Sequence, residues 1–153
     1  MLIDKKLIKD IKINVARSLS EDIGDGDITA QLIPKNVVSD ALVVTREKAI
    51  LCGQAWFDEV FNQLDHSVTV KWLVQDGARL EPDQHICTLN GPARSLLTGE
   101  RVALNFLQTL SGTATTAREY AILASESGVE ILDTRKTIPG LRLAQKYAVF
   151  TGG

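Results

Sequence analysis

The chain has 153 residues, with 17 Lys and Arg side chains against 19 Asp and Glu, which gives a formal net charge of −2. Hydrophobic residues make up 44% of the sequence and charged residues 24%, a balance typical of a folded globular protein. So small a net charge produces no overall field that attracts nucleic acid or an anionic membrane. Any anion site must therefore come from local groups of Arg and Lys.

The apolar segments predict neither a membrane span nor a secretory leader. The longest apolar runs are far shorter than the roughly 20 residues that cross a bilayer, and the charged start around Asp4, Lys5 and Lys6 has no apolar core. We therefore expect a cytoplasmic protein without a membrane or nucleic-acid partner. Cys52 and Cys87 stand alone in apolar, strand-like segments, which predicts buried thiols rather than a disulfide or a metal site.

Helical and strand patterns follow one another in the first 92 residues. Asp4 suits the N-cap of an amphipathic helix whose apolar residues recur at spacings of three and four until a stop near Gly24. β-Branched residues and alternating polarity predict strands at 37–44, 67–74 and 86–89, with a short aromatic helix at 56–64. Together these elements predict a small α+β layer with structural and interface roles rather than chemistry.

An acidic segment, Glu-Asp-Ile-Gly-Asp-Gly-Asp-Ile-Thr at residues 21–29, has two interpretations. Its carboxylate density resembles part of a calcium loop, but an EF-hand also needs alternating oxygen ligands and a bidentate glutamate at its twelfth position. Ala30, Gln31 and Leu32 do not continue that pattern. A glycine turn whose Asp side chains accept hydrogen bonds from backbone amides is therefore the favoured interpretation.

The second half begins with a strongly apolar helix. Pro92 suits its first turn, and we expect Gly112 to end it, with Thr113 or Thr115 capping a further helix that ends at Gly128. Polar side chains spaced four, three, four and three form one stripe along the first helix: Arg94, Thr98, Arg101, Asn105 and Gln108. This stripe faces a partner subunit, a wet cavity or a ligand, or it is a salt-bridged structural feature, and the spacing alone leaves these alternatives open.

A cationic loop follows the apolar run Val129 to Leu132, which we interpret as a buried strand. Arg135 and Lys136 would then lie just beyond the carboxyl end of a parallel strand, where α/β sheets and barrels place their ligand sites. Helical spacing resumes over 141–150. Because one strand-helix unit cannot close a barrel of about 250 residues, we expect the chain to be a fragment of a longer protein.

Several motifs together resemble the quinolinate phosphoribosyltransferase family, the carboxylating nicotinate-nucleotide pyrophosphorylases of NAD biosynthesis. They are Gly-Glu-Arg-Val-Ala-Leu-Asn-Phe-Leu at 99–107, Leu-Ser-Gly-Thr-Ala-Thr at 110–115, Asp-Thr-Arg-Lys-Thr-Ile-Pro-Gly-Leu-Arg at 133–142 and Lys-Tyr-Ala-Val at 146–149, with the acidic segment at 21–29. The resemblance implies a mixed α+β and α/β fold. An N-terminal α/β sandwich would occupy 1–110, and 111–153 would form the incomplete start of a C-terminal α/β barrel.

The resemblance also implies an activity and a site. Members are pentosyltransferases that convert quinolinate and phosphoribosyl pyrophosphate into nicotinate mononucleotide, pyrophosphate and carbon dioxide, with Mg²⁺ holding the pyrophosphate. They form homodimers or higher oligomers. Arg101 would reach the quinolinate of the partner subunit, while Thr134, Arg135 and Lys136 would line the pocket of their own subunit. Fixed cations suit such substrates because Arg pairs with carboxylates bidentately and Lys acts as a point charge on either anion.

The family pattern continues beyond residue 153 with an Asn-His-Arg segment and then a lysine, a glutamate and an aspartate. Because none of these is present, the sequence assigns no catalytic residue and no metal ligand, and turnover by these 153 residues alone is not expected. Two other interpretations remain open. The protein is a related phosphoribosyltransferase that uses another base such as nicotinate, or the chain is a non-catalytic association module.

Overall fold

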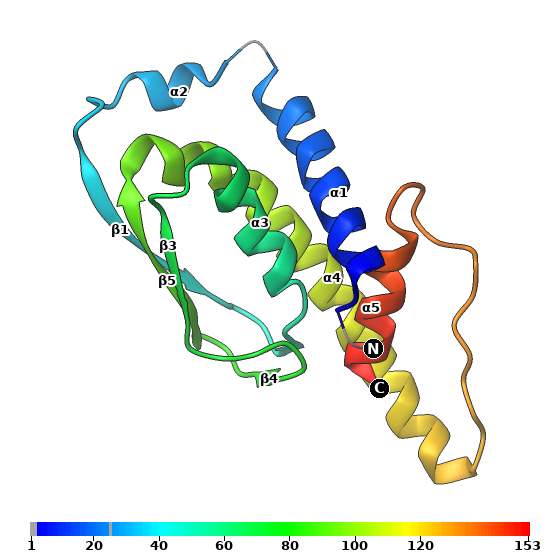
Figure 1. The fold of residues 1–153 in the computed structure, drawn as a ribbon. Coiled ribbons are helices and arrows are strands. Elements are labelled where there is room, and N and C mark those ends of the chain that lie inside the picture. Colours follow the sequence, from blue (N-terminus) through cyan, green and yellow to red (C-terminus); the bar gives the residue numbers. More distant parts are fainter. Residues whose placement is uncertain (1–2, 25) are drawn as a thin grey trace.

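The structure, a computed structural model, describes residues 3–24 and 26–153 and consists of an antiparallel sheet covered by helices (Figure 1). The helices are α1 (Lys5–Ile23), α2 (Ile28–Gln31), α3 (Gln54–Leu64), α4 (Ala93–Ser127) and α5 (Arg142–Gly152). The strands are β1 (Val38–Val44), β2 (Ala49–Ile50), β3 (Thr69–Trp72), β4 (Arg79–Leu80) and β5 (His85–Pro92). The predicted α+β layer at the start of the chain is confirmed by this architecture.

Helix α1 begins and ends where its local sequence predicts. The Oδ1 atom of Asp4 accepts a hydrogen bond from the Leu7 N–H at 2.8 Å, which satisfies one of the free amides of the first turn. Gly24 follows the last turn with a φ of 50°, a conformation that glycine adopts without steric cost. Most of the predicted apolar face is buried and packs into the core, namely Leu7, Ile11, Val15 and Leu19, whereas Ile8 of that face is 43% exposed.

The main sheet has the order β1-β5-β3, with both pairings antiparallel. Strand β5 is central and largely buried, whereas β1 lies at an edge of the sheet and is mostly exposed. Helix α3 packs on the sheet through Phe57, whose ring centroid lies 5.1 Å from that of Trp72 on β3. The three predicted strands are thus confirmed, with boundaries that differ by a few residues. A second, two-stranded sheet pairs β2 with β4.

Helix α4 corrects one prediction, because it continues through Gly112 to Ser127 over 35 residues. A glycine inside a helix costs only about 1 kcal/mol relative to alanine, and packing on both sides of this position outweighs that cost. Thr113 and Thr115 do not cap a new helix. Their hydroxyls donate to the carbonyls of Thr109 and Ser111 one turn earlier, at 3.1 and 2.7 Å. The expected stop at Gly128 is confirmed, with a φ of 67° there.

The segment 129–132 corrects a second prediction, because it forms no strand among the described residues. Val129, Ile131 and Leu132 are 61%, 54% and 76% exposed. A buried strand needs neighbours that pair with its N–H and C=O groups, and neither described sheet includes this segment. It runs instead as an extended connection from the end of α4 to α5 (Figure 1).

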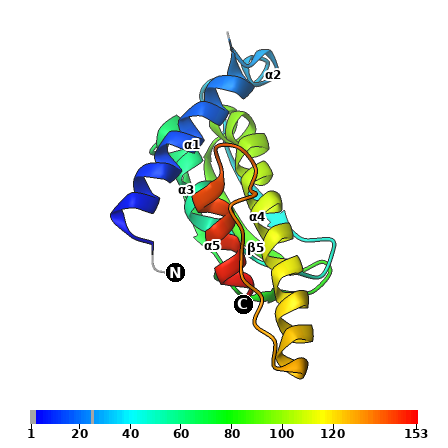
Figure 2. The same cartoon turned by 90° about the vertical axis from the view of Figure 1, so that its right-hand side faces the viewer.

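Helix α5 lies alongside α4 (Figure 2) and is confirmed close to its predicted position. Ala144 and Ala148 are fully buried, and a Cβ atom added at Gly152 would clash with the Ala114 carbonyl oxygen. The two helices therefore approach closely because α5 presents small residues. One hydrophobic core contains residues from α1 to α5, on both sides of the domain boundary predicted at residue 110. The core does not mark that boundary, which stays a prediction. Among the described residues, no helix has the length and apolar character of a membrane span.

Candidate functional site

The first two residues of the polar stripe on α4 hold N-terminal segments of the same chain. The Arg94 guanidinium donates to the carbonyl oxygens of Ile33 at 2.6 Å and Gln31 at 3.1 Å. One turn later, the Thr98 hydroxyl donates to Asp27 Oδ2 at 2.9 Å. These contacts attach α2 to α4 and support the structural interpretation for the first part of the stripe.

The acidic segment behaves as a turn, as the sequence favoured. Asp27 Oδ1 accepts a hydrogen bond from the Ala30 N–H at 3.0 Å, which caps the short helix α2. Asp25 lies outside the described residues. In the part of the chain that the structure describes, no group of three or more His, Cys, Asp or Glu side chains could hold a metal ion.

Arg101 is a cation of the α4 stripe that pairs with a carboxylate and still remains accessible. Its Nη1 atom lies 2.9 Å from Asp22 Oδ1, and its side chain is 72% exposed while that of Asp22 is 20% exposed. The hydrogen bond to Asp22 raises the pKa of the Arg101 guanidinium, which remains charged at any physiological pH. An exposed pair of this kind contributes little to stability. It leaves the remaining Arg101 donors open to a further anion.

Thr134, Arg135 and Lys136 lie together in the loop between α4 and α5, and all three are exposed. The Thr134 hydroxyl oxygen accepts a hydrogen bond from the Lys136 N–H at 2.7 Å, which closes a tight local turn. Within the described residues, the side chains of Arg135 and Lys136 make no ion pair. The loop therefore presents two uncompensated cations on a defined turn.

Two residues of α5 contact the flanks of this cationic loop, and the sequence did not predict them as part of the site. The Lys146 Nζ atom donates to Asp133 Oδ2 at 2.5 Å, and Gln145 Oε1 accepts from the Ile138 N–H at 2.8 Å. Asp133 and Lys146 both lie inside the recognised family motifs. That membership was the only available indication, because no regular spacing joins two positions thirteen residues apart.

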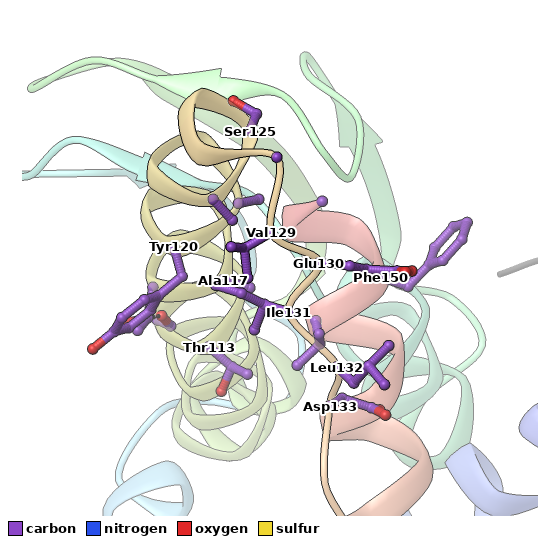
Figure 3. A pocket seen from close by; sticks show the side chains of 17 residues that line it. Thr113, Ala117, Tyr120, Ser125, Val129, Glu130, Ile131, Leu132, Asp133 and Phe150 are labelled. Atoms are coloured by element: carbon purple, nitrogen blue, oxygen red, sulfur yellow. Dashed lines mark hydrogen bonds between the residues drawn. The ribbon is translucent and has the colours of Figure 1, made fainter.

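A cavity of about 800 Å³ lies between the second half of α4, the segment 129–133 and the end of α5 (Figure 3). Its lining is dominated by small and apolar residues, among them Ala117, Ala121, Ile131 and Leu132. It contains two acids and no Arg or Lys. Such a surface does not suit a dicarboxylate or a phosphate, so this cavity is not the candidate anion site.

A buried polar network connects the N-terminal layer to α5. Asp76 Oδ1 accepts hydrogen bonds from the backbone N–H groups of Gly53 and Gln54 at 3.0 and 3.3 Å, and its Oδ2 accepts one from the Tyr147 hydroxyl at 2.9 Å. Burial raises the pKa of Asp76 above its ordinary value, although these hydrogen bonds oppose the shift. Burial likewise raises the pKa of the Tyr147 hydroxyl. Both groups act as fixed hydrogen-bonding partners of the scaffold.

The two cysteines match their predicted structural role. Cys52 and Cys87 are both buried and free of disulfides. Burial raises the pKa of each thiol to about 12, so neither is a thiolate nucleophile at neutral pH.

Comparisons with known proteins cover nearly the whole chain. The sequence profile described as quinolinate phosphoribosyl transferase, N-terminal domain, matches residues 27–111, and the corresponding C-terminal domain profile matches residues 113–153. A probable nicotinate-nucleotide pyrophosphorylase (carboxylating) of Bacillus subtilis is 44% identical over 133 residues, which is 87% of this chain and 46% of the relative. A mitochondrial quinolinate phosphoribosyltransferase (decarboxylating) of Nicotiana tabacum is 40% identical over 146 residues, 94% of this chain and 41% of the relative.

Solved structures agree with these sequence matches. The nicotinate-nucleotide pyrophosphorylase of Francisella tularensis superposes with a TM-score of 0.91 at 49% identity, over 95% of this chain and 52% of that one. NadC of Streptococcus pyogenes superposes with a TM-score of 0.90 at 36% identity, with the same coverage. The chain thus spans about half the length of the proteins that it matches.

Proposed function

Because this chain belongs to the quinolinate phosphoribosyltransferase family, we propose that it provides the N-terminal layer and the first substrate-binding loop of such an enzyme. The reaction joins quinolinate to phosphoribosyl pyrophosphate and yields nicotinate mononucleotide, pyrophosphate and carbon dioxide. The proposal places this pentosyl transfer in the cytoplasm. The named location of the Nicotiana relative is mitochondrial, so imaging of a fluorescent fusion tests that part separately.

The observation that carries the proposal is the pair of unpaired cations at Arg135 and Lys136. Quinolinate carries two carboxylates and phosphoribosyl pyrophosphate carries several phosphate charges, so both need fixed positive charge. The hydrogen bond from the Lys136 N–H to the Thr134 hydroxyl favours a turned backbone at this pair. Preorganised charge of this kind lowers the cost of binding an anion and of stabilising the charge that leaves with pyrophosphate.

The proposal assigns Arg101 to the site of a partner subunit in a homodimer or higher oligomer. Its high exposure is compatible with this assignment, since the guanidinium is accessible to a ligand from outside its own fold. Asp22 would then hold the Arg101 guanidinium in place while the guanidinium also binds the partner's substrate. Mixing Arg101→Ala subunits with Arg135→Ala subunits tests the arrangement, because hybrid dimers would regain one intact site. Failure to recover activity in the mixture would contradict it.

Magnesium enters the proposal only through the family resemblance. The described residues do not fit the ion, because they offer no group of carboxylates that could hold it. We therefore derive no step through the metal. What these residues do is bind and orient: Arg135 would pair with a carboxylate, and Lys136 would face a second anionic group.

The test is turnover in a chimera of residues 1–153 followed by the remaining half of the Francisella tularensis enzyme. Arg135→Ala is expected to abolish most of the nicotinate mononucleotide formed from quinolinate. Arg79→Ala is the matched control, because Arg79 has a 75% exposed side chain and lies in β4, away from the loop. Unchanged rate and quinolinate affinity in Arg135→Ala would overturn the assigned role.

Two further candidate functions each have a test of their own. A related enzyme acting on nicotinate needs cations for only one carboxylate, so comparing turnover with quinolinate and nicotinate discriminates the two substrates. A non-catalytic association module is favoured by the exposed apolar side chains of Leu123, Leu132 and Phe150, which are 63%, 76% and 64% exposed. Sedimentation of the 153-residue chain as a monomer at micromolar concentration would contradict that role.

A further inference from the structure

The cationic loop is held at both ends by consecutive residues of α5. Lys146 pairs with Asp133, immediately before Thr134, and Gln145 accepts the N–H of Ile138, two residues after Lys136. The stretch that carries Arg135 and Lys136 therefore lies between two attachment points on one helical turn.

Helix α5 is a firm support for these contacts because it is itself fixed to the core. Tyr147, the next residue, points about 100° further round the helix, where its hydroxyl donates to Asp76 at 2.9 Å and its ring centroid lies 5.5 Å from that of Trp56. The close approach of Gly152 to Ala114 fixes the far end of the same helix. A displacement of the loop flanks would have to break the side-chain contacts of Gln145 and Lys146 rather than carry α5 along.

The charge of Asp133 gives the Lys146 contact a role beyond attachment. A free carboxylate next to Thr134 would repel an incoming dicarboxylate or phosphate, or it would pair with Arg135 or Lys136 and remove the charge that the ligand needs. The side chains of Asp133 and Lys146 are each only 32% exposed, so their pairing is less screened than that of a surface pair.

We propose that Lys146 is a positioning residue that neutralises Asp133 and so keeps Arg135 and Lys136 available to an anionic ligand. This inference rests on the proposed function of the loop as an anion site. It gives Lys146 no contact with the ligand. The cations that bind are those of the loop, and Lys146 acts on them through Asp133.

Titration of the isotope-labelled 153-residue chain with inorganic pyrophosphate, and separately with quinolinate, tests the inference by following the backbone amide resonances of residues 134–138. Lys146→Met is expected to weaken both affinities by about fivefold at low salt, because it exposes an uncompensated carboxylate beside the site. Lys35→Met is the control for the change in net charge, since Lys35 is an exposed lysine outside the loop.

The decisive readout is rescue by a second substitution. Asp133→Asn combined with Lys146→Met removes both charges and is expected to restore the affinity to within about twofold of the unchanged chain. A purely structural role would leave the double variant as weak as the single one, and that result would overturn the inference. The defect of Lys146→Met is also expected to shrink as salt is raised, whereas loss of loop structure would persist.

Other outcomes are equally decisive. Lys146→Met that binds like Lys35→Met overturns the inference, as does an unchanged chain whose loop resonances do not respond to pyrophosphate. If Lys146→Met does not fold, the exchange Asp133→Lys with Lys146→Asp keeps the pair, and weaker binding by that variant overturns the inference. Arg135→Ala separates the two proposals. Unchanged binding in that variant defeats the proposed function itself, while weakened binding there with normal Lys146→Met defeats only this inference.

Discussion

The stripe on α4 and the loop before α5 contain the same residue types but use them differently. Arg94 and Thr98 are committed to carbonyl and carboxylate groups of the chain's own N-terminal segments. Arg135 and Lys136 have no such ionic partner among the described residues, because the nearby carboxylate of Asp133 is bound by Lys146. Position on a polar stripe is therefore not sufficient to identify a cation that binds a ligand, because such a cation can be committed to the protein's own carbonyl and carboxylate groups.

The strongest test of this contrast is the loss of Arg135. In the chimeric enzyme, Arg135→Ala is expected to lower kcat/KM for quinolinate by about 100-fold, since it removes a charge-assisted pair with the substrate. Its free energy of unfolding should remain within about 0.5 kcal/mol of the unchanged protein, as for other exposed surface positions. Steady-state kinetics and urea unfolding measure the two quantities. A large loss of stability would mean that the loop cation has a structural use.

The opposite pattern is expected for Arg94. Arg94→Ala should lower the free energy of unfolding by about 2 kcal/mol, because two carbonyl acceptors lose a charged donor. Pyrophosphate binding by the loop should not change. Urea unfolding and the amide titration of the 153-residue chain give the two readouts. Weakened anion binding with intact stability would erase the distinction between stripe and loop.

A smaller effect is expected for the hydroxyl of Thr134. Thr134→Val leaves the Lys136 N–H without its side-chain acceptor and should weaken pyrophosphate binding about threefold, in keeping with the modest net value of one exposed hydrogen bond. Thr134→Ser keeps the hydroxyl and serves as the control. Equal affinities in the two variants would show that the turn does not organise the loop.

The smallest predicted effect concerns pH and the link between the N-terminal layer and α5. The folded-state pKa of Asp76 is raised by burial, so its protonated form favours the folded state. This contribution is fully present below the ordinary carboxyl pKa of about 3.9 and is lost as pH rises through the raised folded value. The stability of the unchanged chain relative to Asp76→Asn should therefore fall over that window. Urea unfolding at several pH values measures it, and a rising difference would contradict the assignment.

Local chemistry made much of the fold predictable. The cap at Asp4, the glycine stop at Gly24 and the aromatic face of α3 all depend on neighbours within a few residues. The break expected at Gly112 was wrong because a single glycine is a weak stop when both flanking turns are packed. The strand expected at 129–132 was wrong because a buried strand depends on partners that lie far along a chain.

The site residues stay a prediction, and only part of their arrangement in the structure could be expected from the sequence. Arg135 and Lys136 stand out as a cationic pair after an apolar run, and the family motifs point to them directly. Their support by Gln145 and Lys146 was not predicted, since it depends on where the chain returns after Pro139. Arg101 stays a predicted substrate-binding residue, and its pairing with Asp22 depends on how α1 crosses α4 and has no counterpart in sequence spacing.

The unbroken course of α4 has a consequence for the modularity of this protein. The two family profiles meet between residues 111 and 113, in the middle of that helix and inside a shared core. Because the two matched regions share one helix and one core, we expect that they do not fold separately. We expect heat or denaturant to melt them together in one transition, and limited proteolysis to cut first in the exposed segment after Gly128.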